Sequence, residues 1–101
     1  MSVFVTFRAV GDPVELERRA AADPQALRKL LDAAAAHGVI HHRFLGTEDG
    51  DIMVLDEWET AEGFKAFLAE NPQIQATMRE VGVSAEPEIK FWRPLATNDE
   101  L

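Results

Sequence analysis

Two of the three histidines, His41 and His42, are adjacent in the stretch VIHHRFLG (residues 39–46). Its composition predicts a β-strand, and neighbouring side chains on a strand point to opposite faces of the sheet. The two histidines therefore cannot serve one site, and each needs a partner on its own face. The next predicted strand, DIMVLDEW (residues 51–58), offers the carboxylates Asp56 and Glu57.

The pairing of these two strands depends on the turn between them. Asp49-Gly50 favours a tight turn, and a two-residue turn would place His42 opposite Glu57 and Arg43 opposite Asp56. A four-residue loop would preserve the faces, whereas an odd-length loop would break this assignment.

We therefore expect His42 and Glu57 to form the candidate catalytic pair. A carboxylate beside an imidazole fixes its tautomer and raises its basicity, as a general base requires. The alternative is a purely structural hydrogen bond, which is the commoner role of such pairs. The two residues could also be metal ligands, but an iron or zinc site needs at least a third ligand, and the sequence spacing indicates none.

Under this pairing one face of the sheet is apolar and suited to packing against helices. The predicted pocket between sheet and helices is lined by Phe44, Leu55, Phe64, Phe67, Ile74 and Met78. The other face is too apolar and aromatic to lie in water, and a second copy of the sheet is its simplest cover. The residues expected in this homodimer interface are His41, Arg43, Val54, Asp56, Trp58 and Trp92.

The remaining elements follow from capping residues and periodicity. A strand is expected over residues 3–8, and Asp12-Pro13 and Asp23-Pro24 each signal a helix start, with Gly38 ending the second helix. Thr60 begins a third helix that Asn71-Pro72 interrupts, a further helical piece ends at Gly82, and residues 86–94 form the last strand.

The order βαββαβ predicts a single α+β domain over residues 1–94, with a flexible tail over residues 95–101. We expect a ferredoxin-like, four-stranded antiparallel sheet with its helices on one face.

Composition excludes several classes of function. There is no cysteine, which excludes disulfides, thiolate nucleophiles and cysteine-bound zinc. A formal net charge of -8 disfavours nucleic acid and anionic membranes as partners. No leader or membrane-spanning run is evident, so a cytoplasmic protein is expected.

Four segments together resemble a known family: VFVTFRAV, the helix ending in AAAAHG, MVLDEW followed by ETAEGFKAFLAENPQI, and PEIKFWRP. They are similar to the antibiotic-biosynthesis-monooxygenase-like branch of the dimeric α+β-barrel superfamily, over nearly the whole chain. The resemblance implies two sheets pressed into a barrel and a small-molecule pocket between each sheet and its own helices. Fold-level kinship does not fix the activity.

The catalytic residues of characterised members of that family are not reproduced. Haem-degrading members use an asparagine on the first strand, a tryptophan on the second helix and a haem-ligating histidine further along it. In this chain the first strand contains no asparagine, Phe67 stands at the place of the tryptophan, and Met78 lies near that of the histidine. Haem degradation is therefore not expected. The polyketide-oxidising members use no metal or flavin but rely on groups that include tyrosine, which this chain lacks.

Three kinds of function stay open. The first is a cofactor-independent monooxygenase acting on an apolar aromatic compound, with His42 as base. The second is a protein that binds a small hydrophobic ligand without converting it, and the third is a structural dimer without a ligand.

Overall fold

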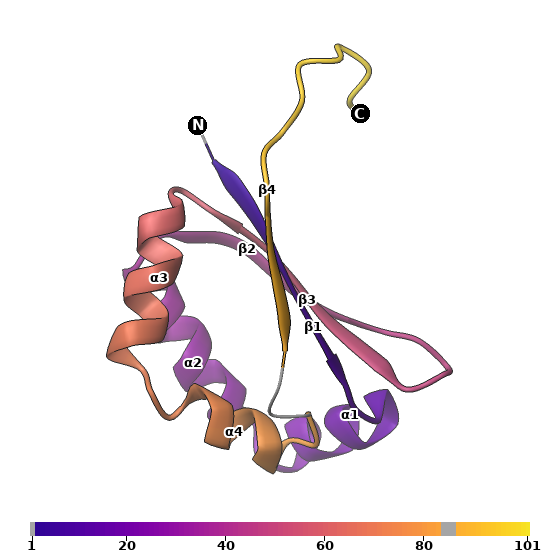
Figure 1. The fold of residues 1–101 in the computed structure, drawn as a ribbon. Coiled ribbons are helices and arrows are strands. Elements are labelled where there is room, and N and C mark those ends of the chain that lie inside the picture. The colour runs from indigo at the N-terminus through magenta and orange to yellow at the C-terminus, as the bar shows by residue number, and fades with distance from the viewer. Residues whose placement is uncertain (1, 84–86) are drawn as a thin grey trace.

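The computed structural model describes residues 2–83 and 87–101. It contains the strands β1 (Val3–Val10), β2 (Val39–Gly46), β3 (Asp51–Trp58) and β4 (Glu88–Trp92). The helices are α1 (Pro13–Ala22), α2 (Pro24–Ala36), α3 (Ala61–Glu70) and α4 (Ile74–Glu80). The strands form one antiparallel sheet in the order β2-β3-β1-β4, and the helices lie on one side of it (Figure 1). The predicted α+β fold is confirmed.

None of the helices in the described ranges is both long enough and apolar enough to cross a bilayer.

The helix starts follow the sequence signals with one exception. Asp12 caps α1 by accepting from the backbone N–H of Val14 at 3.0 Å, and Thr60 caps α3 by accepting from that of Gly63 at 3.0 Å. Asp23 precedes Pro24 as expected but makes no side-chain capping bond. The start of α2 therefore depends on the proline, whose fixed φ suits the first helical turn.

The hairpin between β2 and β3 differs from the prediction. Thr47 N donates to Asp51 O at 3.0 Å, which leaves three residues, Glu48 to Gly50, in the loop. Gly50 has φ +92°, the left-handed conformation that closes three-residue hairpin loops. Because the loop is odd in length, the register shifts by one residue and β3 presents the opposite face to that expected.

In the observed register His42 lies opposite Asp56, and His41 lies opposite Glu57. The predicted His42–Glu57 pair is therefore wrong. A bulge between Val39 and His41 also interrupts the ladder, so that Val39 pairs with Trp58.

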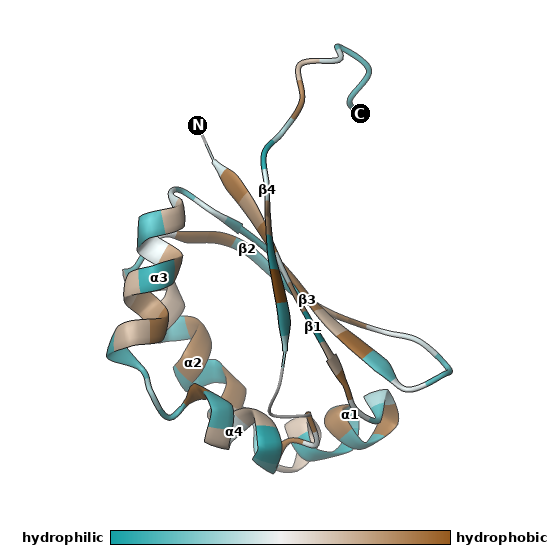
Figure 2. Ribbon diagram, viewed as in Figure 1, coloured by the Kyte–Doolittle hydropathy of each residue, from teal (hydrophilic) through white to brown (hydrophobic). Residues whose placement is uncertain are grey.

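The corrected face of β3 forms the centre of the core. Ile52, Val54, Asp56 and Trp58 point to the helices and are buried, whereas Leu55 lies on the open face and is 38% exposed. Val54, Asp56 and Trp58 were expected at the open face, and Leu55 under the helices, so these four placements are corrected. Figure 2 shows helices α2 and α3 with both hydrophobic and hydrophilic residues, as expected for helices with one buried side.

The edge strand β4 keeps the predicted alternation. Phe91 pairs with Val5 of β1 and its ring lies 5.6 Å from that of Phe64 in α3, on the helix-covered side. Trp92 lies on the open face, where its Nε1 donates to Thr6 Oγ1 at 2.9 Å. Glu86, at the start of the expected strand, falls outside the described residues.

Candidate functional site

The central feature of the site is a hydrogen bond between neighbouring strands. His42 on β2 and Asp56 on β3 are direct cross-strand partners, and Nδ1 of His42 lies 2.8 Å from Oδ1 of Asp56. An ionised carboxylate only accepts, so His42 carries its proton on Nδ1 and leaves Nε2 as an acceptor in the neutral ring. This is the arrangement that a general base requires.

The carboxylate of Asp56 is itself held in place by Trp58. The indole Nε1 of Trp58 donates to Oδ2 of Asp56 at 3.2 Å, and Trp58 is fully buried. Its ring packs against Phe64 and Phe67 of α3, with centroids 5.4 Å and 5.5 Å away. The rigid aromatic cluster thus fixes Asp56, and Asp56 fixes the tautomer of His42.

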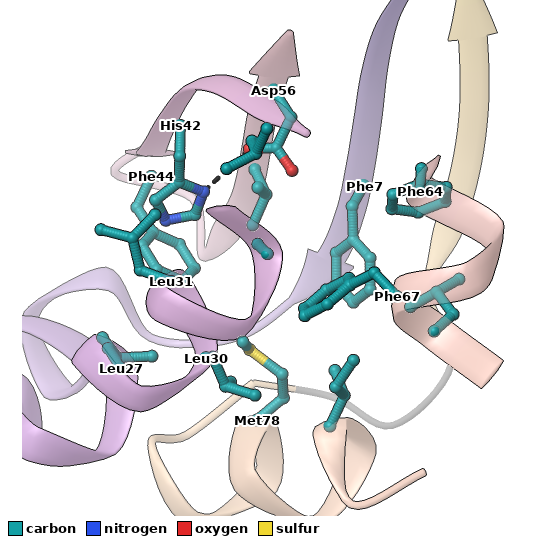
Figure 3. Close-up of a pocket in the computed structure, with 15 residues that line it drawn as sticks. Phe7, Leu27, Leu30, Leu31, His42, Phe44, Asp56, Phe64, Phe67 and Met78 are labelled. Atoms are coloured by element: carbon teal, nitrogen blue, oxygen red, sulfur yellow. Dashed lines mark hydrogen bonds and ion pairs between the residues drawn. The ribbon is translucent and has the colours of Figure 1, made fainter. Parts of the chain in front are cut away.

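The imidazole of His42 faces a small cavity between the sheet and helices α2, α3 and α4 (Figure 3). The cavity measures about 70 Å³. In Figure 3 the ring of His42 lies beside Leu31 and Phe44, with Nδ1 turned to Asp56 and the second nitrogen turned away from it. The ring of Phe44 meets it edge-on at 5.1 Å. The side chain of His42 is 29% exposed, which leaves it accessible.

Apart from His42 and Asp56, the residues that line the cavity in the described part of the chain are apolar. The structure brings five of the six predicted lining residues to it: Phe44, Phe64, Phe67, Ile74 and Met78. Leu55 is absent from the wall because the register shift turns it to the open face. The remaining lining residues are Phe7, Leu27, Leu30, Leu31, Ala34, Val39, Val54 and Leu68.

The second predicted catalytic residue, Glu57, lies on the opposite side of the sheet. It accepts from Ser2 Oγ at 2.6 Å, and its Oε1 lies 3.0 Å from Nδ1 of His41. The Ser2 hydroxyl, and then His41, hold the pKa of Glu57 below its ordinary value. Since the sheet separates Glu57 from the cavity, it cannot orient His42.

The open face carries three of the six residues expected in an interface. His41, Arg43 and Trp92 are exposed there, and Trp92 is 48% exposed. Arg43 lies opposite Leu55, not opposite Asp56 as expected. The face therefore joins large apolar side chains to basic ones.

Val54, Asp56 and Trp58 are the residues at the site that were predicted on the wrong face of the sheet. A signal for the right face was present, since Ile52, Val54 and Trp58 are β-branched or aromatic, whereas Met53, Leu55 and Glu57 are neither. Such residues favour the buried face of a strand. The faces were instead assigned from Asp49-Gly50, which was predicted to form a two-residue turn.

For a metal ion the arrangement offers His42 and Asp56 as possible ligands. Within residues 2–83 and 87–101, no group of three or more histidines and carboxylates is close enough to hold one.

Solved structures of the same fold cover almost the whole chain. SnoaB of Streptomyces nogalater, a cofactor-independent oxygenase, matches with a TM-score of 0.63 and 20% identity over 98% of this chain and 97% of its own. The monooxygenase from the gene ActVA-Orf6 of Streptomyces coelicolor, solved with the ligand nanaomycin D, has a TM-score of 0.64 and 15% identity over 95% of this chain and 88% of its own. A candidate antibiotic biosynthesis monooxygenase of Nitrosomonas europaea has a TM-score of 0.65 and 13% identity over 95% of this chain and 92% of its own.

The fold is that of the antibiotic-biosynthesis-monooxygenase-like proteins. The resemblance stated from the sequence is thus confirmed at the level of the fold. No protein-family model matches the sequence, and no curated protein matches it significantly. What this chain does must therefore be argued from its own residues.

Proposed function

We propose that this protein is a cofactor-independent oxygenase that binds a small apolar compound in the cavity, with His42 as the general base. The observation that carries the proposal is a hydrogen-bonded imidazole–carboxylate pair in a cavity whose other walls are apolar. Structural neighbours with cofactor-independent oxygenase activity support the same reaction type.

The chemistry needs only a base and dioxygen. Nε2 of His42 removes the proton of an aromatic hydroxyl, and the electron-rich anion then reduces dioxygen at a ring carbon. The ring carbon gains one oxygen atom, the ring loses two hydrogen atoms in becoming a quinone, and the second oxygen atom leaves as water. Positioned proton transfer of this kind contributes roughly 10²- to 10⁴-fold in rate.

Oxygen uptake with a panel of hydroxylated aromatic compounds tests this proposal. His42→Ala should abolish uptake while the compounds still bind, and His41→Ala, which changes the adjacent histidine on the open face, should keep it. Wild-type uptake by His42→Ala would remove His42 from the mechanism. Binding of the compounds without uptake by the unmodified protein would favour the alternative, a non-catalytic binding protein. If the protein bound none of these compounds, the result would favour the third alternative, a structural dimer without a ligand.

We also propose that the protein acts as a homodimer in which the open faces of two sheets meet. Leu55, Leu45 and Trp92 expose between 38% and 48% of their surface there. Apolar side chains on one continuous sheet face are typical of a self-complementary interface. The two cavities would then lie on the outer sides of the joined sheets.

A further inference from the structure

The cavity has a charge pattern that restricts its ligand. Among the fifteen described residues that line it, only His42 and Asp56 are polar, and none is lysine or arginine. The proton on Nδ1 of His42 already satisfies Asp56. A ligand that carries a permanent anionic group would therefore lie near a carboxylate with no free cation to balance it.

Burying such an unpaired charge in an apolar wall is strongly unfavourable. A neutral hydroxyl meets no such penalty, because Nε2 of His42 accepts its hydrogen bond. If the proton is transferred, the imidazolium formed lies between two anions, the ligand and Asp56, and stabilises both. The site thus favours a ligand that enters neutral and becomes charged only beside His42.

The size of the cavity restricts the ligand further. An engineered apolar cavity of about 150 Å³ is known to hold benzene, whereas this cavity measures about 70 Å³. A single ring therefore already requires the wall to yield. Met78 of α4 is the adaptable part of that wall, because methionine is unbranched and flexible. Fused rings exceed this volume further, and the surplus would have to lie outside the apolar wall.

From charge and volume together we infer that the substrate is a neutral phenol with one ring. This inference deepens the proposed function and rests on it. The structure thereby assigns this site to small phenols, and excludes aromatic carboxylates and compounds with several fused rings.

Calorimetric titration at neutral pH with four probes tests the assignment. Para-cresol is the reference; para-hydroxybenzoate replaces its methyl group by a carboxylate, toluene lacks the hydroxyl, and anthrol has three fused rings. We expect para-hydroxybenzoate and anthrol to bind more weakly than para-cresol by about tenfold or more. Toluene should bind roughly three- to tenfold more weakly than para-cresol, which corresponds to the loss of one neutral hydrogen bond.

A matched pair of variants tests the charge argument by gain of binding. Leu31 lies beside His42 in the cavity wall (Figure 3), whereas Gln25 is exposed on the same helix, α2, and is not among the described lining residues. Leu31→Lys should improve the binding of para-hydroxybenzoate by about tenfold. Gln25→Lys should not, although it adds a positive charge to the same helix, because its side chain lies outside the cavity wall.

The outcomes separate this inference from the proposed function. Equal binding of para-cresol and either para-hydroxybenzoate or anthrol to the unmodified protein would overturn the inference. If His42→Ala still abolished oxygen uptake, the proposed function would survive that result. If none of the four probes bound and none consumed oxygen, both would fail together.

Discussion

Nδ1 of His42 lies 2.8 Å from Oδ1 of Asp56, and the two residues are direct cross-strand partners on the helix-covered face of the sheet. The side chain of Asp56 is only 11% exposed, so this hydrogen bond is shielded from water. Because both side chains project from regular strands, their geometry is set by the sheet and not by a mobile loop. Such placement suits a base that must be oriented before a ligand arrives.

Asp56→Asn should abolish turnover without unfolding the protein. Nε1 of Trp58 donates to the side chain at position 56, so it selects the carbonyl oxygen of the new amide and turns the NH₂ group to His42. His42 must then accept at Nδ1 and carry its proton on Nε2, which can no longer act as a base. We expect oxygen uptake to fall by roughly a hundredfold or more, with an unchanged circular dichroism spectrum.

The neighbouring carboxylate provides the contrast. Glu57→Gln makes the same chemical change one residue along β3, but on the open face beside Ser2 and His41. Turnover should stay within about twofold of the unmodified enzyme. A larger loss in Glu57→Gln than in Asp56→Asn would restore the pairing expected from sequence and contradict the observed register.

Most of the fold could be predicted from local signals. The ranges 39–46 and 51–58 were predicted as strands with their observed bounds, and Pro24, Thr60 and Gly82 mark helix boundaries as expected. These residues act through the backbone of their own segment. A single sequence is sufficient to interpret them.

The partner of His42 could not be predicted in the same way. Its identity depends on whether the loop before Asp51 holds two residues or three, and Asp49-Gly50 is compatible with both. One residue of difference exchanges Asp56 for Glu57 and moves Val54 and Trp58 to the other face. The cavity volume could not be predicted either, because it depends on how side chains from six elements pack together.

Trp58→Phe should destabilise the fold more than the same change at the second tryptophan. Trp58 is fully buried, and its loss would leave Oδ2 of Asp56 without its donor. An unsatisfied buried acceptor and a small void together cost about 2 kcal/mol or more of unfolding free energy.

Trp92→Phe is the control for this substitution. Trp92 is 48% exposed in the single subunit and donates to Thr6 on the open face, so in dilute, dissociated protein water can replace the lost bond. Its effect should stay within about 0.5 kcal/mol in chemical denaturation. Equal losses for the two variants would mean that the bond between Trp58 and Asp56 contributes nothing to stability.

Glu15 should make the stability of the fold sensitive to acid. Its carboxylate accepts from Arg18 and from Arg19, and these hydrogen bonds lower the pKa of Glu15 from 4.5 to about 2. A carboxyl group whose pKa is lower in the folded state stabilises the fold above its unfolded pKa, and this contribution disappears as the pH falls. Above pH 4.5 the unfolding free energy of the unmodified protein should therefore exceed that of Glu15→Gln. This difference should shrink to nothing as the pH falls to about 2.

Denaturation at a series of pH values measures that difference. Glu17→Gln serves as the control, because Glu17 is exposed on the same helix and has no ion pair within the part of the chain that the structure describes. It should show no such dependence. A gap between Glu15→Gln and the unmodified protein that stayed constant down to pH 2 would contradict the role assigned to the two arginines.

Adjacent substitutions on β3 should separate the dimer interface from the core. Leu55 lies on the open face opposite Arg43, so Leu55→Arg places like charges side by side where a second copy would have to dock. We expect a folded monomer in sedimentation experiments, whereas the unmodified protein should sediment as a dimer.

Val54→Arg puts the same charge into the core, where Val54 is 8% exposed, and should lower the unfolding free energy by about 3 kcal/mol or more. It should therefore unfold the chain instead of dividing the dimer. If Leu55→Arg remained dimeric, the open face would not be the interface; if Val54→Arg gave a folded monomer, the observed register would be wrong.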